Sequence, residues 1–211
     1  MKAGTALLAA AAALATSACS SHHSVPPTRA PAASVTNATT ATTTPAAAAP
    51  STTTATTGQD PLAGASTSAV SVPARSPRAL LSAVRVAHQP GLDRVVFEFE
   101  RDQVPGYSVA YVDRPIREAG SGRAVEVTGG AVLEVVMADA SAADLSSEGV
   151  RRTYLGPPRV RGEATTTLRE AVSAGDFEGR LRWVIGVDRR TGFRVSTLAG
   201  PPRLVVDLRA P

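Results

Sequence analysis

Hydrophobic and polar residues alternate with a period of two in several short stretches of the C-terminal part of the chain. Residues 94–100 are the clearest example, because Val95, Phe97 and Phe99 would share one face and Glu98 would lie on the other. This period is that of a β-strand with one buried face. The same kind of pattern predicts further strands at residues 83–87, 107–112, 131–137 and 180–188.

The stretch from residue 192 to residue 209 predicts two strands joined by a Gly-Pro-Pro turn. On the second of them Leu204, Val206 and Leu208 would form the buried face. The two prolines cannot donate ladder hydrogen bonds, so they belong to the connection. The chain therefore predicts an all-β domain of about seven to eight strands, which is typical of an antiparallel β-sandwich or an open barrel.

Four segments need separate comment. Residues 131–137 are apolar on both faces, which indicates a central strand. Residues 139–148 predict a polar loop with one helical turn, and residues 175–179 predict a turn. Residues 165–172 fit a helix or a strand equally well, so their structure is left open.

Residues 1–19 have the features of an export signal. Lys2 is followed by an apolar run at residues 6–15 and by small residues before Cys19. The run is too short to span a membrane. A cysteine at this place is typical of a bacterial lipoprotein, in which Cys19 carries the lipid. Thr16 departs from that pattern, which usually has an aliphatic residue there, and the alternative is a secreted protein with a free Cys19.

Residues 20–78 are rich in Ala, Thr, Pro and Ser and contain no aromatic residue. Such a segment cannot bury enough apolar surface to offset its chain entropy, so we expect a disordered stalk. All eight aromatic residues lie between Phe97 and Phe193, which places the folded core in residues 79–211. That length suits one domain.

The charge of the chain does not indicate a nucleic-acid partner, although its isoelectric point is about 10.0. Residues 79–211 carry 18 arginines and 17 carboxylates, so the domain is nearly neutral. Its charges of both signs are interspersed, whereas a phosphate-binding surface gathers Lys and Arg in a stripe.

The composition also limits which metal sites and catalytic arrangements the domain can contain. A single cysteine excludes a disulfide within the chain and a cysteine-based metal site. The domain contains one histidine, His88, so a Ser-His-Asp arrangement has one possible base, and no serine lies in a nucleophile motif. We therefore expect no enzyme, no cofactor and no metal, with a hydrolase as the least favoured alternative.

Four segments resemble the AMIN-like domain of actinobacterial envelope lipoproteins. They read GLDRVVFEFE, PGYSVAYVDRP, GDFEGRLRWVIGVD and FRVSTLAGPPRLVVDL, and they occur in order over nearly all of residues 80–211. The resemblance implies a β-sandwich that binds peptidoglycan or another envelope component, in a protein held at the outer face of the membrane by its lipid. It supplies no binding residues.

Candidate ligand contacts come from the residues alone. Exposed tyrosines could stack on sugar faces, and a basic window could pair with the carboxylates of stem peptides or wall polymers. The alternatives are that the tyrosines belong to the core and that Glu148 and Glu163 neutralise the window. A protein partner in the envelope, reached through a sheet edge or an apolar patch, is a further hypothesis. The candidate residues are Tyr107, Tyr111, Tyr154, Arg151, Arg152, Arg159 and Arg161.

Overall fold

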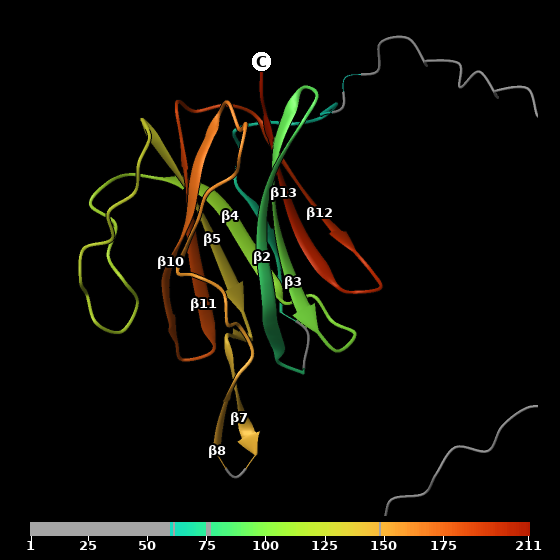
Figure 1. Ribbon diagram of the computed structural model, residues 1–211, viewed down its shortest axis with the longest axis vertical. Helices are drawn as coiled ribbons and strands as arrows, with labels where there is room; N and C mark the ends of the chain where they lie inside the picture. Colours follow the sequence, from blue (N-terminus) through green and yellow to red (C-terminus); the bar gives the residue numbers. More distant parts are fainter. Residues whose placement is uncertain (1–59, 61, 75–76, 148) are drawn as a thin grey trace, which may run out of the picture. The chain divides into compact units, whose positions relative to one another are not determined.

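The alternating segments form strands of two sheets that pack face to face as a β-sandwich (Figure 1). The computed structural model describes residues 60, 62–74, 77–147 and 149–211. Every regular element in these residues is a strand, and eight of the strands have six residues or more. The predicted all-β class and the count of about seven to eight main strands are confirmed.

The five-stranded sheet has the order β12-β13-β3-β2-β6. Its neighbours are antiparallel except for β2 and β6, which are parallel. The predicted closing hairpin is confirmed, because β12 and β13 pair across the Gly-Pro-Pro turn. The bounds are β2 Ala79–Gln89, β3 Leu92–Glu100, β6 Ala140–Ser141, β12 Phe193–Leu198 and β13 Arg203–Arg209.

The six-stranded sheet has the order β1-β4-β5-β11-β10-β9, and all its pairs are antiparallel. The predicted central position of residues 131–137 is confirmed, because β5 lies between β4 and β11. A separate hairpin, β7 with β8, projects beyond the sheets in Figure 1. The bounds are β1 Val70–Val72, β4 Gly106–Val112, β5 Ala131–Ala138, β7 Ala143–Ser147, β8 Gly149–Arg152, β9 Arg159–Val160, β10 Leu168–Phe177 and β11 Arg180–Val187.

The main core fills the space between the sheets with the predicted inward residues. Trp183 is 1% exposed, and its ring packs edge to face with those of Phe97 at 5.8 Å and Tyr154 at 5.6 Å between centroids. The strand faces predicted at β3 and β13 are buried there, together with the alternating apolar residues of β11. Trp183 is the only tryptophan of the chain, so its fluorescence reports on this core.

A second, smaller core lies on the outer face of the six-stranded sheet. The connection between β4 and β5, residues 113–130, covers that face and contributes Ile116 and Val127 (Figure 1). These pack against Val132, Val172 and Val184 of the sheet. The cover explains why Val132 on β5 and Val184 on β11 are apolar although they face away from the main core.

Gly186 on β11 allows this connection to approach the sheet. A Cβ at Gly186 would lie 2.0 Å from the carbonyl oxygen of Thr128, which is backbone and cannot rotate away. We expect Gly186→Ala to lower the free energy of unfolding by about 2 kcal/mol through overpacking. Urea unfolding followed by Trp183 fluorescence measures this. Gly192→Ala, whose Cβ would meet its nearest atoms at 3.4 Å, should stay within about 0.5 kcal/mol of the parent; equal effects of the two substitutions would contradict the argument.

Two local predictions are wrong. In the segment 139–148, residues 140–141 form β6 and residues 143–147 form β7 where a loop with a helical turn was expected, because pairing with β2 and β8 outweighs a weak local pattern. The predicted turn at residues 175–179 is confined to Glu178 and Gly179, since β10 continues to Phe177 through a register irregularity at Gly175. The ambiguous segment at residues 165–172 enters a strand at Leu168.

The folded domain begins earlier in the chain than the predicted boundary at residue 79. Leu62 is fully buried, and β1 pairs with β4. Both Leu62 and β1 lie in the segment that the sequence predicted to be a stalk. The predicted signal, Cys19 and most of the predicted stalk lie outside the described residues. In the part of the chain that is described, no helix is long and apolar enough to cross a membrane.

Candidate ligand-binding surface

The predicted basic window does not form one surface. Arg151 on β8 is held by Glu100 on β3 at 2.8 Å and lies 3.4 Å from Asp144 on β7. Hydrogen bonds from Arg151 hold the pKa of Glu100 below its usual range. The side chain of Arg152 is exposed and has no ion pair with any described residue.

Arg159 and Arg161 form their ion pairs at a different place in the domain. Both pair with Glu170 on β10, a side chain with no exposed surface; the contact with Arg161 is 3.1 Å. Carboxylates on β3, β7 and β10 therefore pair with Arg151, Arg159 and Arg161, whereas Arg152 stays without such a partner among the described residues. Glu163 has no ion pair among the described residues, and Glu148 lies outside them.

All three candidate tyrosines pack in or against the main core. Tyr154 is 7% exposed, and its hydroxyl donates a hydrogen bond of 2.7 Å to the carbonyl oxygen of Pro157. Burial raises its pKa. Tyr107 on β4 is half-buried and packs against the core. Tyr111 also packs against this core, and its ring meets that of Phe193 edge to face at 5.9 Å between centroids.

Tyr111 lies near the C-terminal end of β4 and has a polar setting. Its hydroxyl donates to the carbonyl oxygen of Thr191 at 2.8 Å and accepts from the Thr191 amide at 3.0 Å. The guanidinium of Arg190 lies over its ring, 4.9 Å from the centroid. Burial raises the pKa of Tyr111, so its hydroxyl stays protonated as a hydrogen-bond donor.

A groove lies where the ends of three neighbouring strands meet. The C-terminal ends of β4 and β11 flank the N-terminal end of β5, because β5 is antiparallel to both. This end groove has a volume of about 440 Å³, and its polar side chains are Tyr111, Asp113, Arg114, Asp188, Arg189 and Arg190.

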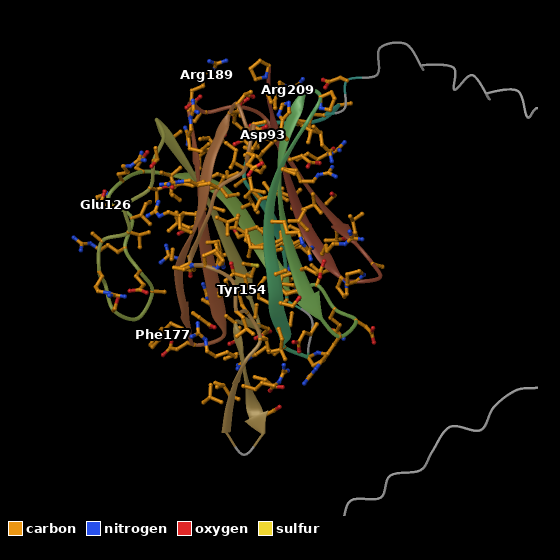
Figure 2. All side chains as sticks on the ribbon, in the orientation of Figure 1. Asp93, Glu126, Tyr154, Phe177, Arg189 and Arg209 are labelled. Carbon is orange, nitrogen blue, oxygen red and sulfur yellow. The ribbon has the colours of Figure 1, made fainter. Side chains whose placement is uncertain are left out.

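A smaller hollow of about 240 Å³ adjoins the end groove and shares Asp188 and Arg189 with it. Its remaining wall includes Thr166, Thr167 and Arg209. Arg189 and Arg209 lie at the same end of the domain in Figure 2, whereas Tyr154 lies toward the other end. The structure thus brings Tyr111, but not Tyr154, to this surface.

Three arginines of the end groove are not neutralised by a carboxylate. The side chain of Arg189 is exposed and has no hydrogen bond or ion pair with any described residue. Arg190 contacts the Tyr111 ring. Arg114 donates from Nη2 to two backbone carbonyl oxygens of the β4–β5 connection, at 2.6 and 3.0 Å. Their remaining N–H groups could bind an anion by charge-assisted hydrogen bonds.

The carboxylates of the end groove offset part of this charge. Asp188 is paired with Arg169, and that pairing raises the pKa of Arg169. Asp113 is exposed and has no ion pair within the described residues, so its negative charge offsets one of the three guanidinium groups. The balance that remains is positive and favours an anionic ligand carrying carboxylate or phosphate groups.

Asp93 fixes the wall of the adjoining hollow. Its side chain has no exposed surface, and Oδ2 accepts hydrogen bonds from the amides of Thr166, Thr167 and Leu168 at 3.0, 2.7 and 2.9 Å. Oδ1 lies 2.7 Å from Nδ1 of His88. Asp93 thus joins β3 to the segment that enters β10 (Figure 2).

His88, the one possible base of the domain, is engaged by this buried carboxylate. The pair resembles the His-Asp part of a catalytic triad, but no serine hydroxyl is bonded to His88 among the described residues. Those residues also contain no group of three or more His, Cys, Asp or Glu side chains placed to hold a metal ion.

Sequence reasoning missed Arg114, Arg189 and Arg190 as candidate site residues. Arg114 follows β4, whereas the other two follow β11, so only the sheet pairing brings them together. The one local signal was the adjacent arginines in the polar turn after β11.

The AMIN-like domain family matches residues 79–210, which is more than half of the chain. The chain therefore belongs to the AMIN-like domain family, and the resemblance seen in the sequence is confirmed. Its class is that of cell-envelope modules associated with peptidoglycan. Comparison with curated proteins and with solved structures gave no match.

Proposed function

We propose that this protein is a non-catalytic envelope lipoprotein whose β-sandwich binds peptidoglycan through the end groove. The observation that carries the proposal is the presence of three guanidinium groups without carboxylate partners in a groove of an AMIN-like domain. Peptidoglycan stem peptides bear carboxylates, which arginine recognises by paired hydrogen bonds. Tyr111 lies beside these guanidinium groups, with Arg190 over its ring.

The proposed location follows from the N-terminal sequence. Residues 1–19 would direct export, and a lipid on Cys19 would anchor the chain to the outer face of the cytoplasmic membrane, as in actinobacterial envelope lipoproteins. The Ala/Thr/Pro-rich segment would let the domain reach the wall. Metabolic labelling with a fatty acid, compared between the parent chain and Cys19→Ser, tests the anchor.

The binding test is co-sedimentation of the full chain with isolated peptidoglycan, with and without attached secondary polymers, over a salt series. We expect the double substitution Arg189→Ala, Arg190→Ala to weaken binding about tenfold, since about 1.4 kcal/mol of charge-assisted contact is lost. Binding that disappears at modest salt in the parent chain would indicate nonspecific charge.

A matched control removes the same charge at the opposite end of the sandwich. Arg152→Ala, Arg180→Ala deletes two exposed arginines without carboxylate partners among the described residues. Arg180 begins β11, whereas Arg189 follows its end. This control should bind like the parent chain. Equal loss in both double variants, or none in either, would count against the end groove.

A further inference from the structure

The sheet edges of this domain are unequal. In the described part of the two sandwich sheets, three of the four edge strands are very short: β1 has three residues, and β6 and β9 have two each. Short edge strands are one way in which proteins prevent unwanted pairing. The fourth, β12, has six residues and lies at the outer edge of the five-stranded sheet beside β13 (Figure 1).

The backbone of β12 presents unused hydrogen-bonding groups. At Phe193 the amide and carbonyl point away from β13, because they bond to Ser66 at 2.9 and 3.2 Å. Orientation repeats every second residue along a strand, so Val195 and Thr197 point the same way. Beyond Phe193, no strand in the described part of the chain pairs with this side of β12.

The outer face beside this edge carries two arginines. Arg194 reaches Asp207 at 3.5 Å, but Arg94 already holds both oxygens of that carboxylate, at 2.6 and 2.9 Å. The Nε of Arg194 is buried and has no partner among the described residues. Arg203 lies opposite Leu198, and its Nε donates to the carbonyl oxygen of Pro201 at 3.2 Å.

We propose that β12 docks an extended acidic peptide segment of an envelope protein partner. The segment adds a strand through the outward groups of Val195 and Thr197 and sets carboxylates against Arg194 and Arg203. A second copy of this chain fits less well, because it would bring the same two arginines to the same edge. This surface is separate from the end groove and does not depend on peptidoglycan binding.

The probe is a heptapeptide in which valine and glutamate alternate, compared with its valine–lysine counterpart and titrated into the full chain by fluorescence anisotropy. We expect the glutamate peptide to bind at least tenfold more tightly than the lysine peptide. Thr197→Pro should abolish the binding, since it removes an outward amide that β13 does not use. Thr197→Val keeps that amide and should bind like the parent chain. Circular dichroism and Trp183 emission check the fold of each variant.

Amide hydrogen exchange on the unmodified chain gives a second readout. Val195 and Thr197 should exchange fast without peptide and slow down on binding, while Ser196, which faces β13, stays protected throughout. Binding that survives Thr197→Pro, or a glutamate peptide that does not bind, would overturn the proposal. Protection of Val195 and Thr197 without peptide would also overturn the proposal. Protection that rises with protein concentration would indicate that a second copy of the chain covers β12. Protection that does not depend on concentration would indicate that a segment of the same chain covers it.

Discussion

Asp93→Ala is expected to lower the free energy of unfolding by about 4 kcal/mol. The substitution removes the acceptor of three backbone amides, and two of these, at Thr167 and Leu168, are buried. A buried amide left without a partner costs about 1–3 kcal/mol, and bonds to a charged acceptor lie at the upper end. Urea unfolding followed by Trp183 fluorescence measures the loss.

Two matched variants separate the amide bonds from the rest of the site. Asp93→Asn keeps a carbonyl oxygen that can face the three amides, so we expect a cost of about 1–2 kcal/mol. His88→Ala removes only the partner of Oδ1 and should cost about 1 kcal/mol. An equal loss of stability in His88→Ala and Asp93→Ala would mean that the histidine contact, and not the three amide bonds, dominates.

Asp93 also links stability to the proposed function. The segment it anchors forms a wall of the hollow that shares Arg189 with the end groove. Loosening of that segment should therefore weaken peptidoglycan binding even under conditions where the variant remains folded. Co-sedimentation of Asp93→Asn, the milder variant, tests this without the complication of unfolding.

The alternation of residues predicted the main strands because the period of a strand is a local property. Phe97, Trp183 and Val206 lie in the main core, as that pattern predicts. Asp207 marks the limit of the pattern: it was expected on the open face of its strand, yet it has no exposed surface. Its cover is Arg94, which is 113 positions away in the chain. A single-strand pattern does not show which side chain a neighbouring strand places beside it.

The candidate site was less predictable than the fold. The basic window is nearly contiguous in sequence, yet its members are divided between Glu100 on β3 and Glu170 on β10. The end groove combines residues from separate strand ends, which a linear pattern cannot bring together. Tyr111 was among the candidates that the sequence singled out, but its place beside Arg190 depends on the pairing of β4, β5 and β11.

The near-neutral domain charge explains why the arginines of the end groove are informative. Many arginines of the sandwich are paired with carboxylates on neighbouring strands, such as Arg85 with Glu98 and Arg94 with Asp207. Guanidinium groups without such a partner among the described residues also occur elsewhere, as at Arg152 and Arg180, but three of them line the end groove together. This clustering marks where the protein can gain several charge-assisted contacts from one ligand.

Glu170→Gln is the second substitution with a large expected effect, and its effect depends on pH. Burial would raise the pKa of Glu170, but hydrogen bonds from Arg159, the Thr128 amide and Arg161 lower it from 4.5 to about 2. A pKa lowered in the folded state adds stability above the unfolded value, and this is lost as the pH falls through the folded value. The difference corresponds to about 3 kcal/mol at pH 7.

We therefore expect the parent chain to be about 3 kcal/mol more stable than Glu170→Gln at pH 7. The gap should narrow between pH 4.5 and about 2, where the carboxyl takes up its proton and loses its advantage over the neutral amide. Urea unfolding of both proteins across this range, followed by Trp183 fluorescence, measures the gap. Glu178→Gln, at an exposed turn without an ion pair among the described residues, is the control and should show little difference at any pH. A gap for Glu170 that stays constant with pH would mean that shape or packing, and not the buried charge, accounts for its contribution.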